Sequence, residues 1–276
     1  MSKPLFLSSI PFDEAIIMAT SQSGTLPVTN LQYQQPEKKW RALNTTPRVY
    51  VRLQGAGRAC SGLAVIAHNG TAEAKLRIMG GLTQDTVNGV NAPYYDSGLV
   101  SMWPVSGPPV DALGYAYLSS LITWTNTQAL PWWSISFSDP TNLSPFEAGR
   151  VMLDAAIRPM AALSGGIALN VVTKGEQRRG DFNRLRTEVR GPNSRRMLLP
   201  WTAVNKDTFR RDFFDFQMAH GIVKDFFFSA DPDSDQDLQM YSMQALFENL
   251  TEFSRLLQYD TSGGIWKGDM VITEQL

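Results

Sequence analysis

Cysteine and histidine are scarce in this 276-residue sequence. The single cysteine, Cys60, excludes an internal disulfide framework and any zinc site built from several cysteines. We expect its side chain to be a small buried apolar group. The two histidines, His68 and His220, are too few for a histidine-rich metal centre. A Ser-His-Asp triad would have to use one of them. Because neither has a neighbouring serine and aspartate pattern that singles it out, we expect both to be structural.

Long apolar runs are also lacking. No stretch approaches the roughly 18 consecutive apolar residues that a membrane-spanning helix requires. The first 13 residues have one lysine and an apolar stretch interrupted by Ser8, Ser9 and Pro11, which makes a poor signal peptide. We therefore expect no membrane insertion, and synthesis in a reducing cytoplasm.

The sequence has no excess of charge of either sign. Lys and Arg number 25 against 26 Asp and Glu, so the net charge is −1, which argues against a nucleic-acid partner. Charged residues make up only 18%, whereas 43% are hydrophobic and 11% aromatic, so the chain can bury a sizeable core. The 16 prolines and 21 glycines are well spread, which favours a turn-rich β protein over a helical bundle.

Strand patterns dominate the first half. Residues 48–53 and 72–79 alternate between apolar and polar side chains, and the second run is expected to end at Gly80-Gly81. Residues 61–67 form an apolar run that predicts a strand buried on both faces. Further strands are predicted over residues 115–124 and 132–137, and the Pro- and Gly-rich segment 82–114 is expected to be mostly loop.

The second half is predicted to be mixed, with one clear helix over residues 205–220. Phe209, Phe213 and Phe216 recur on one helical face, Asp207 is suited to cap the start, and Gly221 is suited to stop the helix. Strands are predicted around this helix over residues 149–157, 166–173, 187–190, 196–199 and 222–229. Residues 240–257 fit a helix or a strand, and we favour a strand followed by a loop. The tail, residues 253–273, is expected to form a hairpin.

The segment from Asp231 to Asp237 places four carboxylates on alternate residues. Such a loop is able to hold Ca²⁺, which prefers several oxygen ligands. It departs from the EF-hand pattern, however, since Gln236 stands at position six and Ser242 at position twelve. We interpret it as a solvated acidic loop and expect no cofactor, with Ca²⁺ as the alternative. No G-x-S-x-G motif and no organised acid pair is present, so we expect no enzyme.

Charge is segregated along the chain. Residues 174–196 carry a net charge of +5, and residues 231–276 carry −7. Opposed patches of this kind can join subunits head to tail, and such contacts close into rings. The alternative is a set of ion pairs within one monomer. The residues proposed for a subunit interface are Arg178, Arg179, Arg184, Arg186, Asp233, Asp235, Asp237 and Trp133.

Seven tryptophans are many for this length. Because Trp132 and Trp133 are consecutive in a strand, one ring faces the core and the other faces outward, and we propose Trp133 as the outward interface anchor. Exposed aromatic rings also stack on sugars. The candidates for such glycan contacts are Tyr94, Tyr95 and Trp103.

Several short motifs together resemble a known family. Val28-Thr-Asn-Leu31, Lys39-Trp-Arg41 and the strands up to Met79 are similar to the start of a discoidin-like (galactose-binding-like) β-sandwich found in tailed-phage virion proteins. Later segments also resemble such proteins: Tyr94-Tyr-Asp-Ser-Gly98, residues 133–140, Phe146-Glu-Ala-Gly-Arg150, the Phe-rich helix and Val271-Ile-Thr-Glu274. The sequence departs from the pattern after Arg150, where Val151-Met-Leu-Asp154 stands in place of leucine or glycine.

The resemblance implies three parts: an N-terminal arm over residues 1–24, a discoidin-like jelly-roll or β-sandwich over 25–145, and a β-rich assembly region over 146–276 that contains the helix. It implies a structural subunit of a long phage tail, at the distal tip or baseplate of the virion, assembled in the host cytoplasm. Such proteins form homo-oligomeric rings and contact the tail tube and the baseplate hub. The alternative is a carbohydrate-binding module that recognises a host surface glycan, because this fold is also a common sugar binder.

Overall fold

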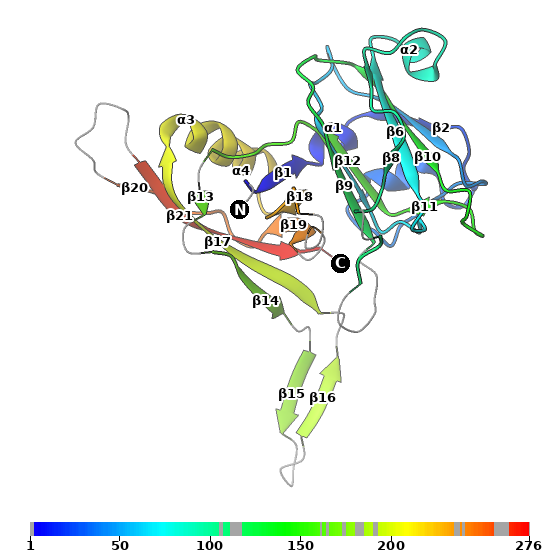
Figure 1. The fold of residues 1–276 in the computed structure, drawn as a ribbon. Coiled ribbons are helices and arrows are strands. Elements are labelled where there is room, and N and C mark those ends of the chain that lie inside the picture. The colour runs from blue at the N-terminus through cyan, green and yellow to red at the C-terminus, as the bar shows by residue number, and fades with distance from the viewer. Residues whose placement is uncertain are drawn as a thin grey trace. The chain divides into compact units, whose positions relative to one another are not determined.

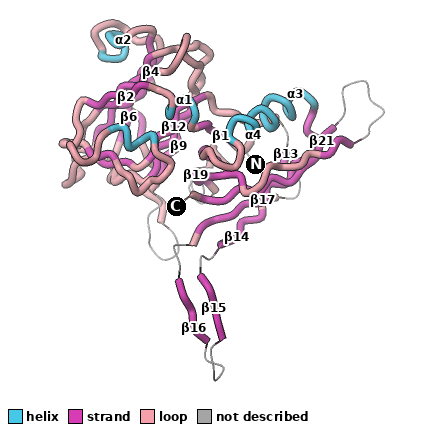
Figure 2. Tube along the Cα trace, turned by 180° about the vertical axis from the view of Figure 1, so that it is seen from behind, coloured by secondary structure: helices cyan, strands magenta, loops and turns pink. Residues whose placement is uncertain are grey.

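The computed structural model of the chain describes residues 3–104, 107–110, 118–160, 162–163, 166–172, 175–179, 185–189, 193–234, 238, 241–256 and 265–275. Strands predominate among them, and helices are few (Figures 1 and 2). The chain forms two compact units. Unit 1 comprises Met1–Arg158 and Phe226–Met243, and unit 2 comprises Pro159–Asp225 and Gln244–Leu276. The predicted fold class, mainly β with one clear helix, is confirmed.

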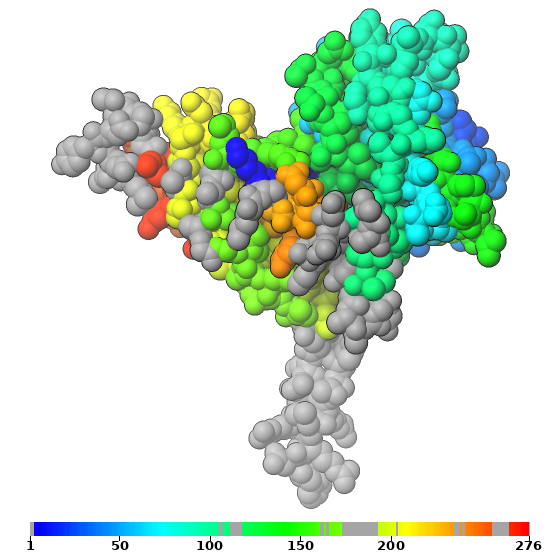
Figure 3. Space-filling view, in the orientation of Figure 1, coloured from blue at the N-terminus to red at the C-terminus, as the bar shows by residue number. Residues whose placement is uncertain are grey.

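Unit 1 contains a large antiparallel sheet. Its strands, in spatial order, are β2 (Ile16–Ala19), β4 (Arg48–Arg52), β10 (Trp132–Ser138), β6 (Lys75–Gly81) and β7 (Tyr95–Asp96), and β8 (Val100–Ser101) also pairs with β6. The strand β6 includes Gly80 and Gly81, which were expected to end it. In the space-filling view, the cyan and green segments of this unit form a continuous surface (Figure 3).

A second antiparallel sheet of unit 1 consists of three strands in the order β12, β5, β9. Their bounds are Arg150–Asp154, Gly62–Ile66 and Ser119–Thr123. Two shorter pairs are also described in this unit: β3 (Trp40–Arg41) with β11 (Glu147–Ala148), and β1 (Leu5–Ser8) with β18 (Phe226–Ser229). Three short helical segments are α1 (Ile10–Asp13), the 3₁₀ turn η1 (Val28–Gln32) and α2 (Gln84–Asn88).

The core of unit 1 lies between these two sheets. Trp133, Ile135 and Phe137 of β10 belong to the same buried cluster as Leu63 and Val65 of β5. The opposite face of the small sheet is covered as well. Ala64 and Ile66 of β5 and Met152 of β12 pack with Leu5, Leu7 and Phe227. Unit 1 is therefore a β-sandwich, and β5 is buried on both faces as its uninterrupted apolar run predicts.

The predicted boundaries differ from those of the structure. Residues 1–24 do not form a separate arm, because β1 pairs with β18 and β2 pairs with β4 inside unit 1. The sandwich also extends past residue 145, since β11 and β12 belong to it, and residues 226–243 return to it. The reason is that the apolar outer face of the small sheet needs a cover, which β1 and β18 supply.

Unit 2 is built on a long antiparallel pair, β17 (Ser194–Asn205) with β21 (Ile265–Glu274). The strands β13 (Ala162–Leu163) and β14 (Ala168–Val172) pair with β17, and β20 (Ser254–Leu256) pairs with β21. The last residues of β19 (Ser242–Phe247) also pair with β21. The predicted strand and loop within residues 240–257 and the predicted C-terminal hairpin are confirmed. The turn of this hairpin lies outside the described residues.

The predicted helix of unit 2 runs from residue 206 to residue 220, as α3 (Lys206–Thr208), a π-helical segment (Phe209–Phe214) and α4 (Asp215–His220). Asn205, rather than Asp207, caps its start, because the Asn205 side chain accepts a hydrogen bond from the Thr208 amide at 2.8 Å. Gly221 ends it with a φ of 55°. The Phe209 ring stacks on Trp266, with centroids 4.3 Å apart, so the apolar face of the helix packs against β21.

One element of unit 2 stands outside its sheet. The strands β15 (Gly175–Arg179) and β16 (Leu185–Val189) pair only with each other among the described residues, as a two-stranded antiparallel hairpin (Figure 1). The helices in the described part of the chain are all too short or too polar to span a bilayer.

Candidate functional site

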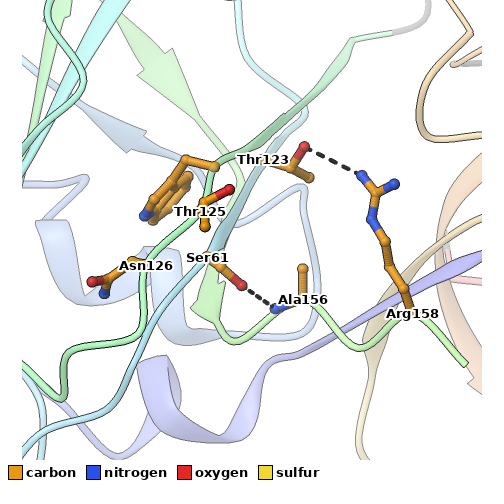
Figure 4. A pocket seen from close by; sticks show the side chains of 7 residues that line it. Ser61, Thr123, Thr125, Asn126, Ala156 and Arg158 are labelled. Atoms are coloured by element: carbon orange, nitrogen blue, oxygen red, sulfur yellow. Dashed lines mark hydrogen bonds between the residues drawn. The ribbon is translucent and has the colours of Figure 1, made fainter.

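A cavity of about 500 Å³ opens at one end of the sandwich in unit 1. It lies where β5 begins and where β9 and β12 end, and Figure 4 shows the side chains that surround it. Its lining consists of Ser61, Thr123, Trp124, Thr125, Asn126, Ala156 and Arg158. Most of these side chains are polar, and Arg158 is the one charged member of this set. We call this cavity the sandwich pocket.

Strand pairing fixes the walls of the sandwich pocket. Gly62 of β5 lies opposite Thr123 of β9 on one side and opposite Asp154 of β12 on the other. The backbone amide of Trp124 donates to the Ser61 carbonyl at 3.0 Å. The Ser61 hydroxyl in turn accepts a hydrogen bond from the Ala156 amide at 2.9 Å (Figure 4). Ser61 therefore joins the three strand ends into one rigid frame.

Asn126 shapes the loop that follows β9. Its side-chain amide donates to the carbonyls of Cys60 (3.2 Å) and Gln128 (3.0 Å), and its Oδ1 accepts from the Gln128 amide at 3.0 Å. Both ends of the amide are thus engaged by the backbone. We assign Asn126 a structural role in which it holds the loop against the pocket.

Trp124 supplies an aromatic wall. Its ring stacks on Tyr95, with centroids 5.5 Å apart and planes 20° apart, and lies 6.0 Å from the buried Trp133. Its indole Nε1–H is buried and has no hydrogen-bond partner among the described residues. An unpaired buried donor costs free energy, but this N–H has almost no exposed surface and is not accessible to a ligand in the pocket.

Arg158 supplies the charge of the sandwich pocket. Its Nη1 donates to Asp233 Oδ2 at 2.8 Å and its Nη2 donates to Asp233 Oδ1 at 3.0 Å. A longer bond of 3.4 Å runs from Nη2 to the Thr123 hydroxyl (Figure 4). The guanidinium is therefore held across the pocket by a carboxylate on one side and by β9 on the other.

A buried acid lies in the last residue of β12. The side chain of Asp154 is 7% exposed, with Arg58 Nε at 3.6 Å from its Oδ1. Burial raises the pKa of Asp154 to about 6, and the positive charge of Arg58 opposes the rise. Burial, with a contribution from Asp154, also raises the pKa of the nearby Cys60 thiol far above its usual range. Cys60 is thus the buried neutral group expected from the sequence.

At the opposite end of β5 a serine and a histidine are in contact, but both are buried away from solvent. His68 Nε2 lies 2.8 Å from the Ser120 hydroxyl, and both residues are fully buried. The Gly70 amide donates to His68 Nδ1, so the ring proton is on Nε2 and points to the serine. Burial lowers the pKa of His68 to about 3. In this tautomer Nε2 has no lone pair with which to take the Ser120 proton, so the pair does not form an activated nucleophile.

The glycan contacts predicted from the sequence are only partly accessible. Tyr94 is 57% exposed, and Tyr95 is half-buried beneath Trp124. Trp103 is 4% exposed, packs against His68 with the two rings tilted by 40°, and donates its Nε1–H to the Thr71 carbonyl at 2.6 Å. The prediction for Trp103 is therefore wrong. Its ring fills the sealed end of the sandwich and has no face open to a sugar.

The predicted orientation of the tryptophan pair is reversed. Trp133 is fully buried, and Trp132 lies on the outer face of the large sheet, where the guanidinium of Arg52 is 5.7 Å from its ring centroid. Gly80 explains the choice. It lies opposite Trp133 in the ladder, and a Cβ there would come within 2.9 Å of the Trp133 ring. The missing side chain makes room for the indole on the core side.

The charged interface candidates divide into two groups. Asp233 is engaged within its own unit by Arg158, with both carboxylate oxygens, so it is not available as a cation ligand in this arrangement. The described residues contain no cluster of acids, histidines or cysteines able to hold a metal ion. The other candidates lie outside the described residues or in strands whose side chains are not described: Arg178, Arg179, Arg184, Arg186, Asp235 and Asp237.

The end of the basic segment pairs with two acids of the acidic segment inside unit 2. Arg195 pairs with Glu274 and Arg196 pairs with Glu248, each through a guanidinium and both carboxylate oxygens. For these four residues the opposed charges form ion pairs within one monomer, which is the alternative that the sequence left open. His220, at the end of α4, is buried, and its Nδ1 donates to the Phe216 carbonyl at 2.9 Å. Burial lowers the pKa of His220, so its role is structural.

Comparison with known proteins gives fold-level matches only. No protein-family model and no curated protein sequence matches the chain. Among solved structures, the family 32 carbohydrate-binding module of NanJ from C. perfringens, in complex with galactose, is 16% identical, covers 54% of this chain and 98% of its own, and has a TM-score of 0.35.

Two further matches are of the same kind. A chitosan-binding module of a chitosanase/glucanase from Paenibacillus sp. IK-5 is 8% identical and covers 51% of this chain and 94% of its own, with a TM-score of 0.35. A module from a family 31 glycoside hydrolase of Clostridium perfringens is 12% identical. The match covers 54% of this chain and 94% of the module, with a TM-score of 0.37. At this level of similarity no ligand is transferred from these modules to this chain.

Proposed function

We propose that unit 1 is a non-catalytic carbohydrate-binding module and that the sandwich pocket is its binding site. The observation that carries the proposal is the lining of the pocket, in which Trp124 lies beside hydroxyl groups and a guanidinium. Sugars combine an apolar C–H face, which packs on aromatic rings, with hydroxyls that need hydrogen-bond partners. The hydroxyls of Thr123 and Thr125 and the guanidinium of Arg158 supply such partners around the ring.

The same lining favours binding over hydrolysis. Glycoside hydrolysis ordinarily requires two carboxyl groups flanking the scissile bond. Among the described residues, none of those lining the pocket is an acid or a histidine. Asp154 is a single carboxyl buried near the strand end, and a single acid does not supply both catalytic roles.

The experiment is a glycan array probed with the full chain. Galactose- and chitosan-type glycans come first, because one of the similar modules is in complex with galactose and another is a chitosan-binding module. Trp124→Ala should lower the affinity for the bound glycan by at least about tenfold, the equivalent of 1.4 kcal/mol. Trp132→Ala is the matched control, because it removes a ring of the same size from the outer face of the sheet. Thr125→Val, at an exposed position of the lining, tests the site without removing a packed ring.

Equal binding by the wild-type chain and by both pocket variants would place the glycan elsewhere. Equal loss in the two tryptophan variants would indicate a general effect on the sandwich. The near-ultraviolet circular dichroism of each variant reports whether its aromatic packing is intact.

We propose, as a second candidate function, that the chain is a structural subunit of a phage tail tip and that unit 2 mediates its assembly. The supporting observation is the hairpin formed by β15 and β16, which pairs with no other described strand. An isolated two-stranded hairpin is marginally stable in water, and its free edges are suited to pairing with another chain. The ring, the tail tube and the baseplate hub that the sequence resemblance implies are the partners proposed for it.

This second proposal is tested on the oligomeric state. The mass of the full chain is measured by sedimentation velocity before and after residues 175–189 are replaced by a Gly-Ser linker. A ring that dissociates in this variant, while glycan binding is unchanged, supports the assembly role. A wild-type chain that stays monomeric, both alone and with tail-tube protein, contradicts it. Changing Arg178, Arg179, Arg184 and Arg186 to Glu then tests whether charge contributes to the contact.

A further inference from the structure

The Arg158 guanidinium presents its planar fork to a carboxylate in the sandwich pocket. Its two terminal nitrogens bond the two oxygens of Asp233 at 2.8 and 3.0 Å. This bidentate arrangement is the one in which guanidinium groups recognise carboxylates in general, whether the carboxylate belongs to a side chain or to a ligand. Asp233 therefore marks the position that a carboxylate occupies in this site.

The contact between Arg158 and Asp233 is a replaceable one. The two side chains are 32% and 53% exposed, so water and salt screen their attraction. Ion pairs at such exposed positions contribute at most about fivefold to an equilibrium. A second carboxylate that also gains contacts with the rest of the pocket can therefore displace Asp233 at small cost.

The remaining lining suits an anionic ligand rich in hydrogen-bond acceptors. Arg158 is the one charged residue of the lining set, and Thr123 and Thr125 contribute hydroxyl donors. No acid belongs to that set, so an amino sugar would find no counter-ion there except Asp233, which already neutralises Arg158.

We infer that the sandwich pocket selects sugars that carry a carboxylate, such as uronic acids, and that Asp233 occupies the carboxylate position on Arg158 until the ligand displaces it. This inference rests on the proposed carbohydrate-binding function and names its ligand class. A guanidinium also binds two oxygens of a tetrahedral anion such as a sulfate ester, so glucose 6-sulfate is the competing anion in the test.

The test measures the dissociation constants of the full chain for D-glucuronate, for its methyl ester, for D-glucose and for glucose 6-sulfate by NMR titration. The Trp124 indole N–H resonance serves as the reporter. The methyl ester keeps the shape of the uronate and removes its charge. We expect the wild-type chain to bind glucuronate at least about tenfold more tightly than the ester, and more tightly than the sulfate.

Three variants separate the roles. Arg158→Gln should abolish the preference for glucuronate over its ester. The readout is the ratio of the two dissociation constants, because Arg158 also donates to sugar hydroxyls and its loss weakens binding of the ester as well. Arg158→Lys keeps the charge but loses the two coplanar N–H donors, and should reduce the preference for glucuronate over its ester. Asp233→Asn should tighten glucuronate binding by up to about fivefold and leave the ester unaffected. Glu73→Gln is the control for net charge, since this exposed acid follows the opposite end of β5 from the pocket.

Each contrary result has a distinct meaning. Equal affinity for glucuronate and its ester, with binding that still depends on Trp124, overturns the carboxylate inference and leaves the carbohydrate-binding function standing. Equal or tighter binding of the sulfate overturns selectivity for a carboxylate. Weaker glucuronate binding in Asp233→Asn overturns the role of Asp233 as the displaced occupant. If none of the four sugars and no glycan of the array binds, both proposals fail.

Discussion

The Arg150 side chain is fully buried in unit 1, where it forms an ion pair with Asp13. Removing Arg150 and removing Asp13 should lower the free energy of unfolding by different amounts. Arg150 donates from Nη1 and Nη2 to the two carboxylate oxygens of Asp13, at 2.5 and 2.8 Å, and from Nη1 to the Leu31 carbonyl at 3.2 Å. Arg150 is 0% exposed, whereas the Asp13 side chain is 26% exposed. The ion pair thus joins β12 to α1 and η1, with the cation in the core and the anion near the surface.

Asp13→Asn leaves a guanidinium in the core without its carboxylate. Breaking a buried ion pair in this way costs about 3–5 kcal/mol, because the remaining charge is not hydrated. Arg150→Met removes the buried charge itself and fills part of its volume. The carboxylate that remains reaches water, so we expect a smaller cost of about 1–3 kcal/mol, mainly from the hydrogen bond lost by Leu31.

The assay is thermal unfolding of the full chain, followed together with hydrogen exchange in β12, because the two units need not unfold in one step. For a unit of this size, 1 kcal/mol shifts Tm by about 2–4 °C, so Asp13→Asn should lower Tm by about 10 °C. The double variant should be more stable than the sum of the two single effects predicts, by 1 kcal/mol or more. Equal costs for the two single variants, or strict additivity, would refute the reasoning.

Three further predictions concern unit 1. The folded-state pKa of Asp154, about 6, exceeds its ordinary value of 3.8, so the folded state favours the protonated carboxyl. The free energy of unfolding therefore falls as the pH rises from 4 to 6 and Asp154 ionises. Asp154→Asn should therefore raise the free energy of unfolding by up to about 3 kcal/mol at pH 8 and change it little at pH 4, as measured by urea unfolding. Cys60, fully buried, should resist iodoacetamide in the native protein and react on unfolding, as measured by mass spectrometry. Gly149→Ala should destabilise by more than about 2 kcal/mol, since its Cβ would lie 2.1 Å from the Pro36 carbonyl oxygen, whereas Gly24→Ala, with open space around it, should be tolerated in the same thermal assay.

The elements that depend on short-range pattern were predictable from the sequence. The alternation in residues 48–53 corresponds to β4, and the apolar run in residues 61–67 corresponds to β5. The helix over 206–220 was predictable because its phenylalanines face one side and Gly221 stops it. Its π-helical segment was not, since a change from one hydrogen-bond spacing to another leaves the apolar residues on nearly the same face.

The elements that depend on long-range pairing were not predictable. The strand β1 pairs with β18, more than 200 residues away in the sequence, and nothing in the first residues indicates that partner. The inward orientation of Trp133 depends on the register between β10 and β6. A shift of one residue would turn Trp132 inward instead, so the alternation alone left the choice open. The sequence signal was Gly80, whose place in the ladder became clear only with that register.

The sandwich pocket combines residues that are close in sequence with residues that only long-range contacts bring together. Thr123, Trp124 and Asn126 are neighbours in sequence at the end of a predicted strand, so they were open to detection as a cluster. Arg158 and Asp233 are 75 residues apart, and their pairing follows from the return of residues 226–243 to unit 1. The acidic segment was recognised in the sequence, but the partner that gives one of its carboxylates a role was not.

The two ends of β5 show why burial, more than residue type, locates the function of unit 1. At the Ile66 end, His68 and Ser120 have the atoms of a nucleophile and its base, yet both are sealed and their tautomer is fixed by Gly70. At the Gly62 end the side chains are chemically plainer, but they line an open pocket, and Arg158 is held there by an exposed ion pair. Buried pairs stabilise the sandwich, whereas a group in an exposed and weak ion pair is able to exchange its partner for a ligand. Binding is therefore expected at the open end, where a carboxylated sugar would replace Asp233 on Arg158.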